Sequence, residues 1–227
     1  MDILMSIRKP YTGRIFDGTK PMEFRTRIGK NFDCVDTIYI YETKRNSGSG
    51  SVIGSVKIKK IIPIPKMKMG TYFLLPYYVD KYGTDEEKET VKKAMDIELN
   101  GYSNSLILSY LFQDDALSYM KETGLPPEHY PTYGSDLKEY NKAKQKENDL
   151  CERCDCWGRK IGFYDEYDES YWKFAIQLEN PVLFKIPMEV GDFRCKNGNR
   201  LKRAPQGWCY VMEPEDIKGD ANKLISR

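Results

Sequence analysis

Apolar and polar positions alternate in short runs between residues 3 and 58, a pattern typical of β-strands. The runs at residues 3–7, 37–41 and 52–58 are rich in the β-branched and aromatic residues that strands favour. Between the first two runs, residues 11–16 have the spacing of a short helix that ends before Gly18. This part of the chain is therefore expected to form several strands and one short helix.

The middle of the chain has a helical pattern. Thr84 and Glu87 have the spacing of a capping box, in which each side chain bonds the backbone N–H of the other, so a helix should begin there. A second apolar run with helical spacing covers residues 106–120, and the charged segment 135–150 predicts a third, exposed helix. The middle is expected to be a helical element of its own.

Strand patterns return after residue 171. Apolar and polar residues alternate over residues 172–178, and short apolar runs follow at 182–186 and 208–212. This order predicts an α+β fold, in which a small β-barrel is interrupted by a helical insertion of about a hundred residues. The expected parts are a discontinuous barrel (residues 1–68 and 170–213), an acidic helical insertion (69–169) and a polar tail (214–227).

The composition is that of a globular chain with enough apolar residues to build a core. Of the 227 residues, 40% are hydrophobic and 31% are charged, and the mean hydropathy is −0.64. The longest uncharged run, residues 99–113, is shorter than the roughly 20 apolar residues of a membrane-spanning helix. The first ten residues do not have the apolar segment of a secretory leader, so we expect a cytoplasmic protein without a membrane partner.

Charges are segregated along the chain, although the net charge is only +2. Residues 1–70 carry 14 basic and 6 acidic side chains, residues 71–170 carry 12 and 21, and residues 171–227 carry 10 and 7. Two basic ends favour a surface that binds phosphates, whereas an acidic middle favours a solvent-exposed element or one that binds a protein partner. We therefore expect RNA or a nucleotide at the ends and, as a further hypothesis, a protein partner for the insertion.

Three of the six cysteines lie close together, at Cys151, Cys154 and Cys156. Their spacing can hold zinc if Cys195 or His129 completes a tetrahedral set. The alternative is a group of reduced or reactive thiols, which nearby cations would favour as thiolates. The sequence leaves both open, so a structural zinc ion is a possible cofactor of this segment.

Motifs at both ends of the chain match those of a known family. The central motif reads Gly18-x-Lys20-x-x-Glu23-x-Arg25, and the strand-like run TIYIY follows it. The other matching segments are ILMSIRKPY from residue 3, IFDGTKPMEFRTR from residue 15, VIGSVK from residue 52 and APQGW from residue 204. Together they resemble the ASCH domain family of the PUA-like superfold. The resemblance implies a small PUA-like β-barrel with one cleft that binds RNA or a modified nucleotide.

Four side chains of the central motif are candidates for this cleft. On an extended strand Glu23, Arg25 and Arg27 project from one face, and Lys20 is expected at its entry. Arginine pairs with a phosphate or a base edge, lysine supplies a point charge, and glutamate accepts a hydrogen bond from an exocyclic amine. The alternative is a surface ion pair between Glu23 and Arg25, which would contribute little. Further candidates for the same cleft are Lys9, Tyr41 and Ser55.

The competing hypothesis is a hydrolase that acts on an N-acylated nucleoside or on RNA phosphodiester bonds. A few small bacterial ASCH proteins look like amidohydrolases of acylated cytidine, and this resemblance implies a functional role for Lys20. Where those proteins have a functional threonine, this chain has Glu23. In either reaction Glu23 would be the catalytic base and Lys20 would stabilise developing negative charge. Neither binding nor hydrolysis is expected to require a cofactor.

Overall fold

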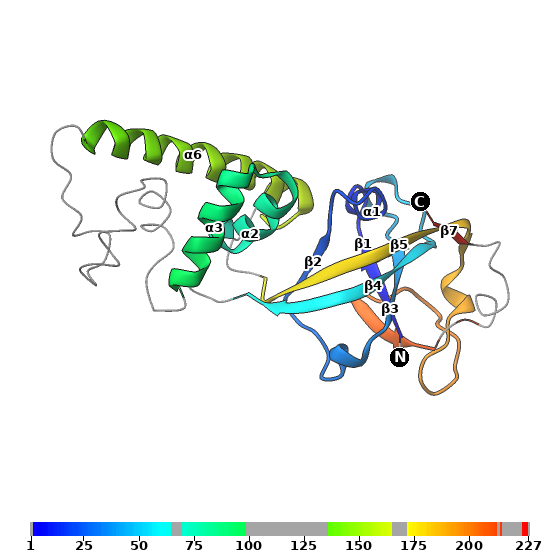
Figure 1. The fold of residues 1–227 in the computed structure, drawn as a ribbon. Helices are drawn as coiled ribbons and strands as arrows, with labels where there is room; N and C mark the ends of the chain where they lie inside the picture. Colours follow the sequence, from blue (N-terminus) through cyan, green and yellow to red (C-terminus); the bar gives the residue numbers. More distant parts are fainter. Residues whose placement is uncertain are drawn as a thin grey trace. The chain divides into compact units, whose positions relative to one another are not determined.

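The computed structural model describes residues 2–64, 70–98, 136–164, 172–212, 214 and 224–226. The chain divides into two compact units. The β unit comprises Met1–Lys66, Ile161–Phe163 and Tyr167–Arg227, and the helical unit comprises Met67–Lys160 and Tyr164–Glu166. Strands dominate the first unit and helices the second (Figure 1), so the predicted α+β class is confirmed.

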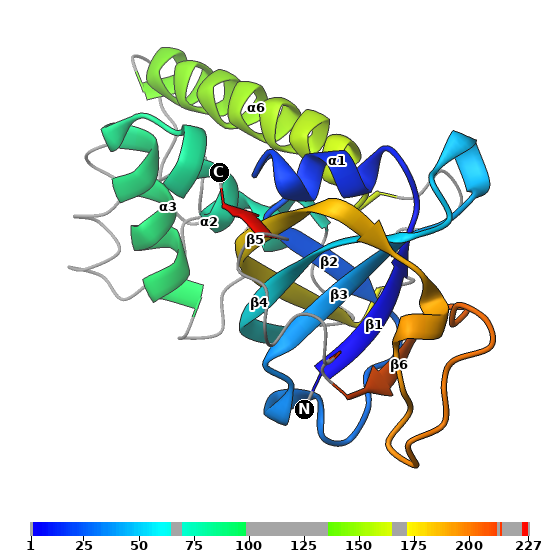
Figure 2. The same cartoon turned by 90° about the vertical axis from the view of Figure 1, so that its right-hand side faces the viewer.

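One curled sheet forms the body of the β unit (Figure 2). Its strands are β1 (Asp2–Ile7), β2 (Met22–Arg25), β3 (Thr37–Glu42), β4 (Val52–Pro63), β5 (Phe174–Met188), β6 (Trp208–Val211) and β7 (Leu224–Ser226). They follow the order β2-β5-β4-β3-β1-β6, and β7 also pairs with β5. β1 and β3 run parallel, and the other strand pairs are antiparallel. β7 lies in the segment expected to be a polar tail.

Short helices complete the β unit. The predicted helix at residues 11–16 is α1 (Tyr11–Phe16), and it follows β1 directly. The single-turn 3₁₀ helices are η1 (Phe32–Cys34), η2 (Arg45–Ser47) and η4 (Val190–Asp192). α1 and β2 are joined by a tight turn at Gly18, whose φ of 76° lies in the left-handed region that glycine adopts without strain. This turn directs the chain into the Lys20 to Arg25 segment.

β5 is one strand where the sequence predicted two. The residues Asn180 and Pro181 interrupt the apolar pattern, but the pairing with β4 continues across them, from Glu179 to Val182. The register shifts at this point, and Asn180 has a φ of 49°. Such a bulge admits a proline, which has no N–H to donate, without ending the strand.

Both faces of the sheet carry buried apolar side chains, because successive residues of a strand point to opposite sides. On one face, Ile3, Met5 and Ile7 of β1 belong to a buried cluster. The cluster that includes Leu4 on the other face consists of Leu4, Tyr39, Val52, Phe184, Met188, Phe193 and Val211. A few charged side chains are buried among these apolar residues. Each of them needs a partner, because burying an unpaired charge costs free energy.

The helical unit contains α2 (Gly70–Tyr82), α3 (Asp85–Glu98) and α6 (Asp136–Ile161), of which the last residue belongs to the β unit. The predicted capping box is confirmed. The Glu87 N–H donates to Thr84 Oγ1 at 3.2 Å, and the Thr84 N–H donates to Glu87 Oε2 at 2.8 Å. The predicted third helix is α6, and the run at 106–120 lies outside the described residues. None of the described helices is long and apolar enough to cross a membrane.

Candidate functional site

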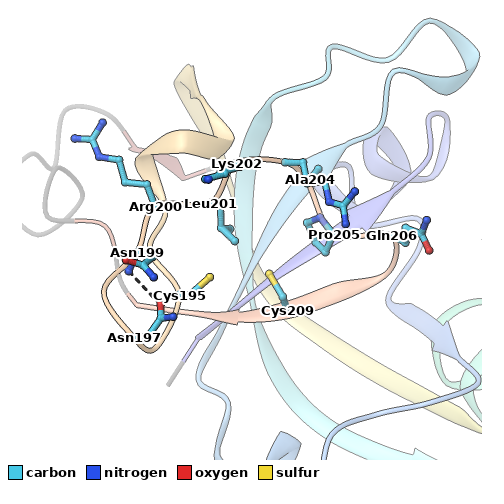
Figure 3. A pocket seen from close by; sticks show the side chains of 11 residues that line it. Cys195, Asn197, Asn199, Arg200, Leu201, Lys202, Ala204, Pro205, Gln206 and Cys209 are labelled. Atoms are coloured by element: carbon cyan, nitrogen blue, oxygen red, sulfur yellow. Dashed lines mark hydrogen bonds between the residues drawn. The ribbon is translucent and has the colours of Figure 1, made fainter.

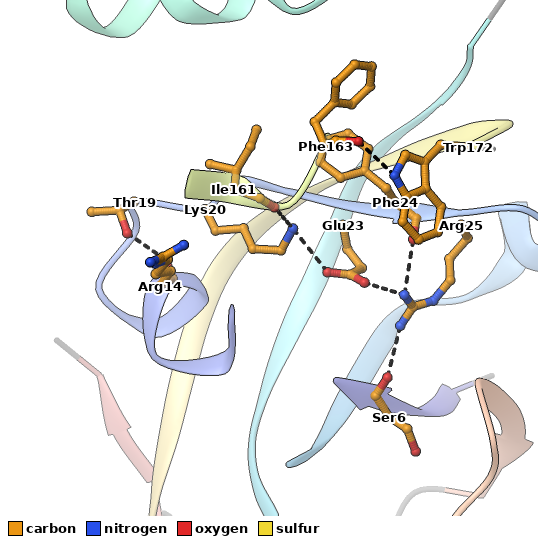
Figure 4. Close-up of polar contacts among 10 residues, drawn as sticks. All are labelled: Ser6, Arg14, Thr19, Lys20, Glu23, Phe24, Arg25, Ile161, Phe163 and Trp172. Atoms are coloured by element: carbon orange, nitrogen blue, oxygen red, sulfur yellow. Dashed lines mark hydrogen bonds and ion pairs between the residues drawn. The ribbon is translucent and has the colours of Figure 1, made fainter. Parts of the chain in front are cut away.

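The β unit contains a cluster of three charged side chains, Lys20, Glu23 and Arg25, which we call the polar cluster (Figure 4). Glu23 and Arg25 are two residues apart on β2 and therefore project from the same face of the strand, as predicted. Lys20 lies in the turn before β2, where its backbone N–H donates to Arg14 O at 2.7 Å. The three residues that the motif suggested are thus brought together.

Lys20 is enclosed, with only 3% of its surface exposed. Its Nζ lies 3.3 Å from Glu23 Oε2 and donates a hydrogen bond to the backbone carbonyl of Ile161. The same ammonium lies 4.8 Å from the ring centroid of Phe24 and 5.3 Å from that of Tyr11. Burial lowers the pKa of Lys20 below 10.5, and the neighbouring Glu23 carboxylate opposes this effect.

The buried position of Lys20 corrects the expectation that it stands at the open entry of a cleft. Phe163 covers the neighbouring Phe24, with ring centroids 4.9 Å apart. The Trp172 indole N–H donates to the Phe163 carbonyl at 2.8 Å, which holds this cover in place. The segment Ile161–Phe163 is more than 130 residues away from Lys20 in sequence, so no local pattern could predict this enclosure.

Arg25 is the most accessible member of the polar cluster, with 16% of its side chain exposed. Its guanidinium donates to the Glu23 carboxylate, to the backbone carbonyl of Phe24 at 3.1 Å and to that of Ser6 at 3.1 Å. The Nε atom is buried and has no hydrogen-bond partner among the described residues. The ion pair considered as the alternative is therefore present, but it is largely buried rather than on the surface.

Arg27 does not belong to the polar cluster. β2 ends at Arg25, so the alternation that was expected to align Arg27 with it does not continue. The Arg27 residue is exposed, and its backbone carbonyl accepts a hydrogen bond from the Trp208 indole at 3.2 Å. The expected ladder of three side chains on one strand face is thus shortened to Glu23 and Arg25.

The further candidates lie at other positions of the β unit. Lys9 is exposed in the turn before α1, and its backbone carbonyl accepts from the Asn46 side chain at 3.2 Å. Tyr41 is half-buried against the apolar cluster of Leu4. Ser55 is half-buried on β4, opposite Val182. No hydrogen bond or ion pair of the described residues joins these three side chains to the polar cluster.

The predicted zinc ligands are not assembled among the described residues. Cys151, Cys154 and Cys156 lie on α6, and Cys195 lies in a loop of the β unit. The described part of the chain contains no group of three or more His, Cys, Asp or Glu side chains that could hold a metal ion. Burial raises the pKa of Cys154 well above its usual value, which keeps this thiol protonated.

A pocket of about 720 Å³ opens beside the loop between η4 and β6 (Figure 3). It is lined by Cys195, Asn197, Asn199, Arg200, Leu201, Lys202, Arg203, Ala204, Pro205, Gln206 and Cys209. The sequence analysis missed this site, because counting charges over residues 171–227 diluted a local run of cations. A count over residues 193–207 finds five basic side chains and no acidic one.

Ser6 on β1 connects the pocket wall to the polar cluster. Its Oγ donates to Pro205 O at 2.6 Å, and its backbone N–H donates to Gly207 O at 2.8 Å. Its own carbonyl accepts the hydrogen bond from Arg25. One residue of β1 therefore contacts both the loop that lines the pocket and the guanidinium of the polar cluster.

Comparison with known proteins finds likeness only at the level of three-dimensional structure. No family model matches the chain, and no curated protein matches it. The solved structures that match include the ASCH protein of Zymomonas mobilis, at 14% identity and a TM-score of 0.37, with 96% of this chain and 91% of that chain covered. A point mutant of the same protein matches at 14% identity and a TM-score of 0.38, with 96% and 94% covered.

These structural neighbours are ASCH domains, the family that the sequence motifs resemble.

Proposed function

We propose that the β unit binds RNA or a modified nucleotide, and that the polar cluster recognises the base. The buried Nε–H of Arg25, which has no acceptor among the described residues, is the observation that carries this proposal. Leaving a buried donor unpaired costs about 1–3 kcal/mol. A shift of the partly exposed Arg25 side chain would bring this N–H to an oxygen of a base or a phosphate, which would accept the hydrogen bond and recover this energy.

The rest of the polar cluster suits the same ligand. The Glu23 carboxylate can accept from an exocyclic amine, and the Arg25 guanidinium can donate to a base carbonyl or a phosphate. Because Lys20 is enclosed, it acts through Glu23: its ammonium lies 3.3 Å from the Glu23 carboxylate and helps to hold that side chain in position. Arg25, with 16% of its side chain exposed, is the member of the cluster that a ligand would contact first.

Isothermal titration of the full chain with cytidine, N4-acetylcytidine and cytidine 5′-monophosphate tests this proposal. We expect binding of at least one of the three, weakened about tenfold or more in Arg25→Gln, which corresponds to the loss of a hydrogen bond to a charged group. The matched control is Arg27→Gln, which removes the same charge outside the cluster. Absence of binding to all three ligands, or equal losses in the two variants, would refute the proposal.

A hydrolase is the second candidate, and the lowered pKa of Lys20 favours it. Burial lowers the pKa of Lys20 below 10.5, which eases the transfer of its proton, and its Nζ lies 3.3 Å from the Glu23 carboxylate. In amide hydrolysis, Glu23 would take a proton from the attacking water and pass it to the leaving amine, and Lys20 would stabilise the developing negative charge through its contact with Glu23. Cleavage of RNA phosphodiester bonds would use the same two groups.

Incubation of the full chain with N4-acetylcytidine and, separately, with end-labelled single-stranded RNA distinguishes hydrolysis from binding. A hydrolase releases acetate and cytidine, or shortened RNA, and loses this activity in both Lys20→Met and Glu23→Gln. Retention of unchanged ligand supports the binding function.

A protein partner of the helical unit and a cytoplasmic location stay predictions from the sequence.

A further inference from the structure

The loop at residues 193–207, here called the basic loop, concentrates positive charge without any acidic side chain to offset it. Its conformation is held by backbone hydrogen bonds: Leu201 N–H donates to Phe193 O at 2.8 Å, and Cys195 N–H donates to Asn199 O at 2.8 Å. Gly198, with a φ of 81°, lies in the turn that the inner pair, Cys195 and Asn199, closes. The loop therefore presents its side chains from a defined backbone.

Two of the five cations of the basic loop have structural roles. The Arg194 guanidinium donates to Gly198 O at 3.1 Å and closes the turn. The Lys196 ammonium lies 4.6 Å from the ring centroid of Tyr210. The remaining three, Arg200, Lys202 and Arg203, are exposed, and none has an ion-pair partner among the described residues.

The same three cations line the pocket, whose floor is apolar. Figure 3 shows the side chains of Cys195, Leu201 and Cys209 converging below the loop. Burial, together with the neighbouring Cys195, raises the pKa of Cys209 to about 11, so this thiol is uncharged at neutral pH and does not repel anions. Cations at the rim and apolar groups at the floor match a nucleotide unit, which has an anionic phosphate and a flat base with apolar faces.

We propose that the basic loop and its pocket bind the phosphodiester backbone of a single-stranded RNA. In its choice of ligand, the inference rests on the proposed function, and it adds a second site. Ser6 contacts both the loop and Arg25, so a strand held on the loop lies beside the polar cluster that recognises the base. The loop supplies affinity that does not depend on sequence, and the polar cluster supplies selectivity.

Fluorescence anisotropy of the full chain with a labelled 12-nucleotide oligouridylate RNA, at 50–300 mM KCl, tests the inference. Each phosphate contact on a single strand contributes about 0.7 to the slope of log affinity against log salt. In the triple variant Arg200→Gln, Lys202→Gln, Arg203→Gln we expect the slope to fall by about 2 and the affinity to fall at least about tenfold. An unchanged slope and affinity would overturn the inference.

The control is a second triple variant with the same loss of charge, Lys59→Gln, Lys60→Gln, Lys185→Gln. These lysines are exposed on β4 and β5 of the same unit. Retained RNA affinity in the control supports a local site, whereas equal losses in both triples show binding by net charge and overturn the inference. A charge-keeping variant, Arg200→Lys with Arg203→Lys, should retain the salt slope.

The experiment separates failure of this inference from failure of the proposed function. Uncharged cytidine and N4-acetylcytidine report on the polar cluster alone, and the loop triple should leave their binding unchanged. Loop-dependent RNA binding without nucleoside binding would refute the proposed base recognition and support the basic loop. Nucleoside binding together with RNA binding that is unchanged in the loop triple would support the proposed base recognition and overturn the inference about the basic loop.

Discussion

At the scale of single residues, the Glu23 carboxylate lies between two cations, Lys20 at 3.3 Å and the Arg25 guanidinium. All three groups are largely withdrawn from water, so each depends on the others for its charge. The arrangement is asymmetric. Without Lys20, Glu23 still has Arg25, but without Glu23 two buried cations face one another.

This asymmetry predicts unequal effects of two substitutions. Glu23→Gln should lower the free energy of unfolding by about 3–5 kcal/mol, because it leaves uncompensated buried charge. Lys20→Met keeps the aliphatic chain against Tyr11 and Phe24 while removing the charge, and should change stability by less than about 1 kcal/mol or raise it. Urea unfolding of the purified variants measures both, and equal losses would contradict the prediction.

The lowered pKa of Lys20 predicts a pH dependence. Between the lowered pKa of the folded state and the unfolded value of 10.5, the unfolded chain binds this proton and the folded chain has released it. Stability rises with pH wherever the unfolded state binds more protons. The free energy of unfolding of the native chain should therefore rise relative to that of Lys20→Met as the pH approaches 10.5. Urea unfolding measures both proteins from pH 7 to 10. A constant difference between their free energies of unfolding over this range would contradict the prediction.

The members of the polar cluster could be predicted from the sequence, but their environment could not. The spacing of Lys20, Glu23 and Arg25 follows from a turn and a strand, both local features with recognisable signals. The enclosure of Lys20 depends on the backbone of Ile161, which is brought near by the fold of the whole β unit. The end of β2 at Arg25, which separates Arg27 from the cluster, has no clear signal in the alternation of side chains.

At the scale of elements, a buried carboxylate ties α1 to the end of β3. Glu42 accepts a hydrogen bond from the Thr12 hydroxyl at 2.6 Å and another from the Ser49 backbone N–H at 2.7 Å. Burial alone would raise the pKa of Glu42, but these hydrogen bonds outweigh it and hold the pKa below 4.5. The loop before β4 is thereby fixed to the helix that precedes the polar cluster.

Replacement of Thr12 by valine should weaken this link. Thr12→Val removes a buried hydrogen bond to a charged group and should lower the free energy of unfolding by about 2 kcal/mol at pH 7. The stability that a lowered carboxyl pKa provides is fully present above the unfolded value and is lost as the pH falls through the folded one, so the difference from the native chain should shrink as the pH falls below 4.5. Thr19→Val, at an exposed position, serves as the control in thermal melts at both pH values.

Sequence signals predicted an element correctly where residues close together in the sequence interact with one another. The capping box at Thr84 and Glu87 marked the start of α3 correctly, because it is made entirely by residues of one turn. The break expected at Asn180 did not occur, since pairing with β4 on both sides maintains the strand through the bulge. Long-range pairing overrides a local turn signal when the partner strand is continuous.

At the scale of the whole molecule, the β unit includes Ile161–Phe163 from the end of the insertion. Two deletions test the importance of this segment: residues 67–160 or residues 67–163 replaced by a flexible linker. We expect both to fold, with the larger deletion less stable by about 3 kcal/mol, because it removes the Phe163 ring from Phe24 and the carbonyl that Lys20 bonds. Circular dichroism melts measure the stability of the two deletion variants. Identical melting curves would contradict a stabilising role of Ile161–Phe163.

The pairing of Pro63 with Phe174 has a consequence for how this protein can be divided. A cut inside residues 67–160 leaves β1 to β4 on one polypeptide and β5 to β7 on the other, yet β5 lies between β2 and β4 in the sheet. Each fragment alone would expose unpaired strand edges, and the strands of the other fragment pair with these edges. The two halves should therefore reassemble when co-expressed, and the chain offers a split reporter whose reconstitution restores the contact of Lys20 with Ile161.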